Sequence, residues 1–175
     1  MTFPRRTRLA GALAMAAAAA VALAACSNGG SSSTTSSDSA SGSKNLTLKI
    51  GSLLPTTGTL AQLGPPEIAG VTAAVKDINA AKAGISISTT QKDSGDTSTN
   101  IASQGAKALL SSGVSAVIGA ASSSVSLSFI DQLVAAKVVQ LSPANTSPTF
   151  STYKDNGYYF RTAPSDVLQG RVLGQ

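Results

Sequence analysis

The chain has 175 residues, with 13 Lys or Arg, 8 Asp or Glu, one cysteine and no histidine or tryptophan. Without histidine, Ser-His-Asp and Cys-His catalysis and zinc sites built on His and Cys are excluded, and a single cysteine excludes an internal disulfide. The formal charge of +5 includes Arg5, Arg6 and Arg8, and without them ten basic residues face eight acidic ones. No cluster of Lys and Arg follows residue 44, so we expect no nucleic-acid partner.

The amino terminus has the pattern of an export signal. After the three arginines, an unbroken run of small or apolar residues extends from Leu9 to Ala25 and leads directly into Cys26. This order predicts a signal peptide over residues 1–25. The segment Leu23-Ala24-Ala25-Cys26 resembles the lipobox of bacterial lipoproteins, which implies that Cys26 carries a lipid and anchors the protein outside the cytoplasm, at the bacterial cell membrane. Alternatives are a free thiol at Cys26 after ordinary cleavage, or an uncleaved membrane anchor.

The segment after Cys26 differs in composition from the apolar run before it and from the sequence after residue 45. Residues 27–44 read SNGGSSSTTSSDSASGSK, in which Ala40 is the one apolar side chain. Such a segment cannot bury a core, and we expect residues 26–45 to form a lipidated, disordered linker.

From residue 46 onward, apolar patterns of strand and helix type alternate. Leu46, Leu48 and Ile50 predict a strand that ends before Pro55, and Pro65-Pro66-Glu67 predicts the start of a helix that ends at Gly84. Further predicted elements are a strand from Ile85, a helix capped by Asp96, Thr97 or Ser98, a strand over 114–118, a helix from Ser122–Ser124 to Val134, strands over 138–141 and 158–160, and a helix over 165–175. This order predicts an α/β fold with a doubly wound parallel sheet, incomplete at its C-terminus.

In an open parallel sheet, ligands bind beyond the carboxyl ends of the strands. Three loops are expected there, and they contain Thr57, the serines from Ser122 to Ser124, and the segment from Ala144 to Thr146. Serine hydroxyls and N–H groups at a helix start suit a carboxylate. A carbonyl at Ala144 and a hydroxyl at Thr146 suit an ammonium group. Helix capping and an ordinary turn are the alternative roles of these two loops.

Other patterns do not favour an enzyme. Ser151-Thr152-Tyr153-Lys154 has the S-x-x-K spacing of penicillin-binding proteins, but S-D-N and K-T-G are missing. The sequence has no P-loop, G-x-G-x-x-G or G-x-S-x-G motif. For Asp93, Asp96 and Asp166, capping and turn roles are sufficient explanations. We therefore expect no catalytic residue, cofactor or metal.

The ordered part of the sequence resembles the type I periplasmic binding proteins of branched-chain amino acid ABC transporters. The motifs that carry the resemblance are Ile50–Gly58, AVKDIN at residues 74–79, VIG with SSS at 117–124, SPANTSP at 142–148 and YFRTAPSD at 159–166. The resemblance covers residues 46–175 and implies a two-lobed clamp, of which these residues form the N-terminal lobe and the second lobe is absent.

The resemblance also implies roles for individual residues. Ser123 would hold the carboxylate of an amino acid, and the Ala144 carbonyl and Thr146 hydroxyl would hold its ammonium group. Ser122, in the same serine loop, is a further candidate for the carboxylate. Thr57 and Asp166 are weaker candidates. One residue departs from the family, because Asn145 stands where the turn usually has alanine or serine.

Together these features predict the lipid-anchored substrate-binding subunit of an ABC importer. Its partners would be an amino acid of the Leu, Ile or Val kind, the permease subunits, and the membrane through Cys26. An alternative function is a lipoprotein that uses the same clamp to sense amino acids or amides.

Overall fold

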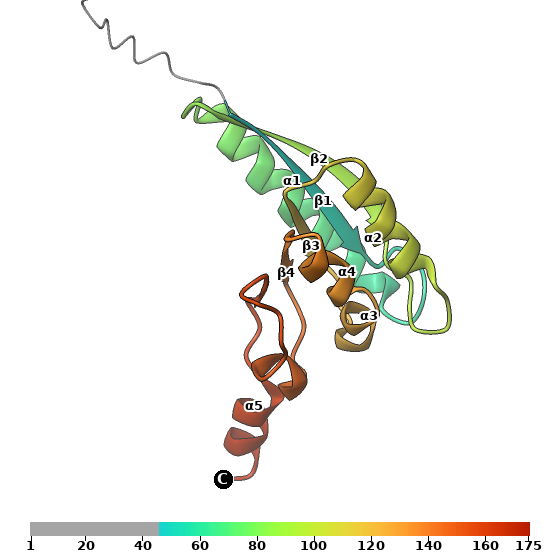
Figure 1. The fold of residues 1–175 in the computed structure, drawn as a ribbon. Helices are drawn as coiled ribbons and strands as arrows, with labels where there is room; N and C mark the ends of the chain where they lie inside the picture. The colour runs from blue at the N-terminus through green and yellow to red at the C-terminus, as the bar shows by residue number, and fades with distance from the viewer. Residues whose placement is uncertain (1–45) are drawn as a thin grey trace, which may run out of the picture. The chain divides into compact units, whose positions relative to one another are not determined.

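A computed structural model of the chain describes residues 46–175. The predicted signal peptide (1–25), the predicted lipidation site Cys26 and the predicted linker lie outside the described residues. Five parallel strands form one sheet in the order β2-β1-β3-β4-β5 (Figure 1), which confirms the predicted α/β fold class. The strands are β1 (Leu46–Leu54), β2 (Ile85–Asp93), β3 (Ala116–Gly119), β4 (Val139–Ser142) and β5 (Tyr159–Arg161).

The helices follow the predicted order with two differences. They are α1 (Gly64–Ala80), α2 (Ile101–Ser111), α3 (Ser123–Leu127), α4 (Ile130–Ala135) and α5 (Asp166–Leu173), with short 3-10 turns at Ala61–Leu63 and Pro148–Ser151. The single helix expected between Ser122 and Val134 is interrupted at Ser128 and Phe129. The Ser128 hydroxyl donates to the carbonyl of Val125, at 2.7 Å, which competes with the helical hydrogen bonds. Phe129 leaves helical geometry and is almost completely buried.

The predicted capping of α2 is wrong. The helix begins at Ile101 after Asn100, and no side chain caps it. The Asp96 carboxylate instead accepts the backbone N–H of Ser98, two residues further on, at 3.0 Å. This short-range bond closes a turn, which is a common use of aspartate in loops.

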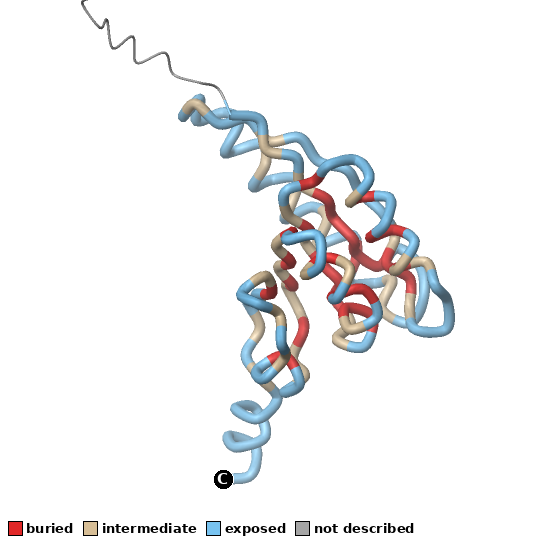
Figure 2. The backbone as a smooth tube through the Cα atoms, viewed as in Figure 1, coloured by how far each residue is buried: buried red, intermediate tan, exposed pale blue. Residues whose placement is uncertain are grey.

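One face of the sheet carries the main hydrophobic core. Leu53 of β1 and Val117 of β3 are fully buried there, and α2, α3 and α4 cover them. The helix residues in this core include Ala102, Ala106, Leu109, Val125, Phe129 and Leu133. Figure 2 shows the buried positions concentrated along these strands and the inner sides of these helices. Because strand and helix bury each other's apolar atoms, this face fixes the strand ends that carry the predicted site.

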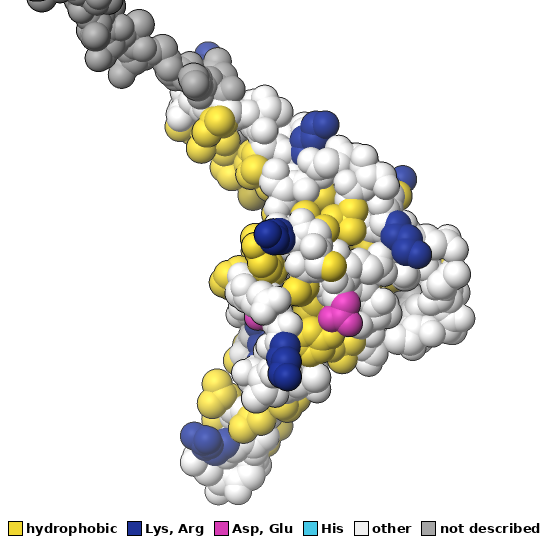
Figure 3. Space-filling view, viewed as in Figure 1, with side chains coloured by type: hydrophobic (Ala, Val, Ile, Leu, Met, Phe, Trp, Pro, Cys, Tyr) yellow, Lys and Arg dark blue, Asp and Glu magenta, His cyan; other side chains and the backbone are white. Residues whose placement is uncertain are grey.

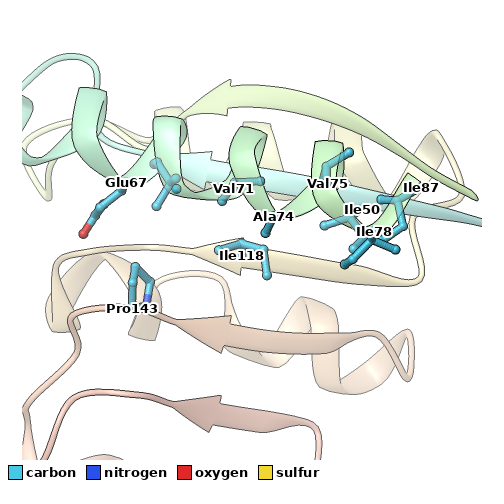
Figure 4. A pocket seen from close by; sticks show the side chains of 11 residues that line it. Ile50, Glu67, Val71, Ala74, Val75, Ile78, Ile87, Ile118 and Pro143 are labelled. Atoms are coloured by element: carbon cyan, nitrogen blue, oxygen red, sulfur yellow. The ribbon is translucent and has the colours of Figure 1, made fainter. Parts of the chain in front are cut away.

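The opposite face is covered by α1 over β1 and β2 and is more open. The strand register places Ile118, Leu141 and Phe160 in one row across β3, β4 and β5, and Phe160 is 52% exposed. Between α1 and the sheet lies an apolar hollow of about 370 Å³, to which Val71, Ala74 and Ile118 contribute (Figure 4). Apolar side chains also reach the surface over α1 (Figure 3). Within residues 46–175, α1 therefore leaves part of this face uncovered, and no helix there could span a membrane.

Gly64 provides a test of how tightly the loop after β1 is folded against α1. A Cβ atom at Gly64 would lie 1.7 Å from the carbonyl oxygen of Pro55, whereas a Cβ at Gly70, in the same helix, would meet nothing within 4 Å. Because backbone cannot yield as a side chain does, Gly64→Ala should lower the free energy of unfolding by about 2–3 kcal/mol. Gly70→Ala should raise it by roughly 0.5–1 kcal/mol, since alanine favours helix. Denaturant unfolding measures both, and an equal effect of the two substitutions would contradict the close approach.

Candidate functional site

The loops after β3 and β4 meet at the carboxyl edge of the sheet, where the sequence predicts a site. The hydroxyl oxygen of Ser123 accepts the backbone N–H groups of Thr146 and Ser147, each at 3.2 Å. A single side chain therefore joins the two loops. Ser123 and Thr146, which are 23 positions apart in the chain, become parts of one surface.

Three hydrogen-bonding groups at this junction have no partner within residues 46–175. Because two N–H groups occupy the lone pairs of the Ser123 oxygen, its own proton remains available to an acceptor. Among residues 46–175, neither the carbonyl of Ala144 nor the hydroxyl of Thr146 makes a hydrogen bond. All three residues are partly exposed. The edge thus presents a hydrogen-bond donor beside two groups that can accept.

Ser122 lies beside this junction but has a different role from Ser123. It is the N-cap of α3 in extended geometry, and its carbonyl accepts the N–H of Ser126 at 3.0 Å. Its hydroxyl makes no capping bond. Because α3 contains only five residues, its dipole offers little to an anion, and the predicted carboxylate site depends on hydroxyl groups more than on the helix start.

Asn145 holds the two loops together from inside. Its side chain is completely buried, and its amide N–H groups donate to the carbonyls of Ala120 and Ala121 at 3.0 and 2.9 Å. Its amide oxygen accepts the hydroxyl of Tyr159 at 2.9 Å. Alanine or serine could not make these three bonds. The departure from the family pattern at this position is therefore a structural tie between β3, β4 and β5.

Residues of β5 support the same loop from behind. Burial raises the pKa of Tyr159 to about 12, so its hydroxyl keeps the proton that it donates to Asn145. Tyr159 also stacks on Phe150, with ring centroids 4.3 Å apart. The guanidinium of Arg161 donates to the carbonyls of Ser147, at 2.7 Å, and Asn145, at 3.5 Å. The sequence motif around Arg161 was recognised, but these supporting contacts could not be read from it.

Thr57 is placed differently from Ser123 and Thr146. Its hydroxyl donates to the carboxylate of Asp93, at the end of the neighbouring strand β2. The sequence predicted only capping or turn roles for Asp93, although its position at the end of β2, beside the loop after β1, was a usable signal. Within the described residues, no hydrogen bond joins Thr57 to the other two loops.

Asp166 contacts the site through its backbone. Its N–H donates to the carbonyl of Thr146 at 2.9 Å, while the Ser165 hydroxyl caps α5. Beside Thr146, an open and mainly apolar hollow of about 510 Å³ extends along α5, lined in part by Pro164, Leu168 and Val172. In the part of the chain that the structure describes, no three His, Cys, Asp or Glu side chains lie together as a metal site would need.

Asn145→Ala tests whether this amide supports the site. The substitution leaves the carbonyl of Ala121 without its donor and the hydroxyl of Tyr159 without its acceptor, while the carbonyl of Ala120 keeps the Ser142 hydroxyl at 2.7 Å. The unpaired buried groups should cost about 2–4 kcal/mol of unfolding free energy. Tyr159→Phe removes one donor and should cost about 1 kcal/mol. The double variant should cost less than the sum, because the two groups share a bond. A loss below roughly 0.5 kcal/mol for Asn145→Ala would contradict this role.

Comparisons with known proteins identify the fold. Residues 47–175 match the family described as periplasmic binding protein. The branched-chain amino acid binding protein LivJ of Streptococcus pneumoniae, solved with isoleucine, is 32% identical, with a TM-score of 0.62 over 69% of this chain and 34% of that one. An ABC transporter substrate-binding protein of Desulfitobacterium hafniense, solved with Leu, is 31% identical, with a TM-score of 0.60 over 73% and 37%.

A third structure, an extracellular ligand-binding receptor of Rhodopseudomonas palustris HaA2, is 26% identical, with a TM-score of 0.63 over 73% of this chain and 34% of that one. No curated protein matches the chain. The chain spans about a third of the length of the structures it matches. The sheet order, the family match and these structures agree, and the chain belongs to the type I periplasmic binding protein family.

Proposed function

We propose that this protein is the extracytoplasmic substrate-binding lipoprotein of an ABC importer and that it binds an amino acid. The observation that supports the proposal is the junction of Ser123 with the loop of Thr146, where the Ser123 proton, the Ala144 carbonyl and the Thr146 hydroxyl make no hydrogen bond among residues 46–175. An α-amino acid presents an acceptor and a donor of opposite charge only a few bonds apart, so it complements such a surface.

Each group of the ligand has a partner of the right kind. The Ser123 proton would be donated to the carboxylate, and charge makes this bond stronger than a neutral one. The Ala144 carbonyl and Thr146 hydroxyl would accept from the ammonium group, which has three donors and no acceptor. Ser122 lies close enough in sequence to add a second hydroxyl to the carboxylate side.

An apolar side chain is favoured for the ligand. The hollow beside Thr146 is lined by Pro164, Leu168 and Val172, which would make contact with a branched aliphatic group. Two solved relatives at or above 31% identity contain isoleucine and leucine, respectively. These observations support an amino acid of the leucine, isoleucine or valine kind.

The remaining parts of the proposal concern the protein's partners and its cellular location. In a two-lobed clamp, closure excludes water from the ligand and strengthens its charge contacts. Delivery to permease subunits and anchoring through a lipid on Cys26 complete the proposed role. Because one lobe offers only half of such a clamp, we expect this chain alone to bind leucine weakly, in the millimolar range.

Nuclear magnetic resonance titration of the chain with leucine tests the site directly. We expect fast-exchange shifts in the amide signals of residues 122–124 and 144–147. 3-Methylbutan-1-amine, which lacks the carboxylate, and 4-methylpentanoate, which lacks the amine, should each give smaller shifts, because each loses one half of the charge pairing. Micromolar or tighter binding of leucine would contradict the need for a second lobe.

The substitutions Ser123→Ala and Thr146→Ala should each weaken leucine binding by about 1–3 kcal/mol, because a charged group of the ligand loses its partner. Because the unmodified chain is expected to bind leucine only in the millimolar range, a loss of this size should remove the leucine-induced amide shifts at the concentrations that can be reached. Ser124→Ala is the matched control, since Ser124 is exposed and its hydroxyl makes no bond among the described residues. An unchanged response in both site variants, or no response in the unmodified chain, would refute the assignment.

A further inference from the structure

The loop between β1 and α1 is exposed and yet held at many points. Its middle residues, 56–59, are exposed, while Pro55 before them and Gly64 after them are buried. Gly64 lies so close to the carbonyl of Pro55 that no side chain fits between them. Both ends of the loop are therefore fixed in relation to each other, independently of what happens in its middle.

The middle of the loop is held by two carboxylates, one at the end of the neighbouring strand β2 and one just after it. One oxygen of Asp93 accepts the backbone N–H groups of Thr56, at 2.8 Å, and Thr57, at 3.3 Å, and that of Gly95 at 2.9 Å. Its other oxygen accepts the hydroxyl of Thr57. A second carboxylate, Asp96, accepts the N–H of Thr59 at 3.3 Å.

Asp93 is ionised at neutral pH. Partial burial raises its pKa, but the hydrogen bonds from Thr57, Gly95 and Thr56 outweigh that effect and lower the pKa to about 2. An ionised acceptor makes stronger bonds than a neutral one. The contact between Asp93 and the loop should therefore persist over the whole range of pH in which the protein would work.

The loop between β1 and α1 lies where its rigidity can affect ligand binding. Since β1 lies between β2 and β3, the loop after β1 lies beside the loop that contains Ser123, at the same edge of the sheet. A binding loop that is already ordered loses little conformational entropy when the ligand binds. Its affinity for the ligand is therefore higher than that of a loop that must first become ordered.

We propose that Asp93 is a positioning residue of the ligand site, and that its carboxylate holds Thr56 and Thr57 as a fixed third wall beside the loops of Ser123 and Thr146. The proposal rests on the proposed amino-acid binding and extends it to a residue that need not touch the ligand. Asp93 acts through the loop, and Thr57 is the link between them rather than an independent contact.

Amide hydrogen exchange in the full chain tests the first half of the proposal without a ligand. Asp93→Ala removes both acceptor oxygens, and the amides of Thr56 and Thr57 should then exchange at least about tenfold faster, while those of α2 and β3 remain unchanged. Asp93→Asn keeps one acceptor oxygen and should give an intermediate effect. Thr57→Val removes only the hydroxyl bond, and it serves if Asp93→Ala fails to fold.

Leucine titration of the same variants, followed by nuclear magnetic resonance, tests the second half. The dissociation constant for leucine should rise about fivefold or more in Asp93→Ala and less in Asp93→Asn. Asp155→Asn is the matched control, because Asp155 is also partly buried and accepts one backbone N–H, from Gly157, but precedes β5 at the opposite edge of the sheet. Its dissociation constant should stay within about twofold of the unmodified value.

The outcomes separate the possible roles of Asp93. Faster exchange together with weaker leucine binding supports the proposal. Faster exchange with unchanged binding shows a purely structural role and overturns it, as does unchanged exchange. If leucine fails to shift residues 122–124 and 144–147 in the unmodified chain, the proposed function itself is contradicted and the ligand role of Asp93 with it, while the exchange result still decides whether Asp93 fixes the loop.

Discussion

The candidate site depends on one buried amide. Asn145 joins the ends of β3 and β4 to β5 through three hydrogen bonds, and no solvent reaches its side chain. A buried polar group of this kind is costly unless all its bonds are made, and here every polar atom of the side chain is used. The loop that follows is consequently held in one position, with Thr146 next to Ser123. The bonds of Asn145 satisfy the polar groups in the interior, whereas the Ser123 proton, the Ala144 carbonyl and the Thr146 hydroxyl stay available at the surface.

A second set of contacts fixes the neighbouring loop by different means. Around Asn145 the bonds are buried and mostly neutral, whereas the loop after β1 is held near the surface by the ionised carboxylate of Asp93. The first arrangement depends on exclusion of water, and the second on charge that water cannot fully screen at hydrogen-bond distance.

The two faces of the sheet also differ in how far helices cover them. Helices α2, α3 and α4 cover one face, while on the other face α1 leaves the row through Leu141 and Phe160 open.

Much of the fold follows from local patterns in the sequence. The alternation in β1 and the apolar run in β3 predicted strands, and the alternating order of strands and helices predicted a parallel sheet with the loops of Ser123 and Thr146 at one edge. The interruption at Ser128 and Phe129 was missed, since the apolar spacing continues through it, whereas the Ser128 hydroxyl bond to Val125 and the burial of Phe129 are features of the folded structure. The bond between Thr57 and Asp93 was missed for a related reason, because it joins residues 36 positions apart whose types are equally typical of turns.

The central claim is that Ser123 and Thr146 form one site that binds the charged ends of an amino acid. A crystal structure of the protein with leucine tests it most directly, because it shows where the ligand lies without reference to affinity. The account predicts the leucine carboxylate within hydrogen-bond distance of the Ser123 hydroxyl and the ammonium group near the Ala144 carbonyl and Thr146 hydroxyl. Leucine bound elsewhere, for example in the apolar hollow between α1 and the sheet, or in the reverse orientation at this edge, would contradict it.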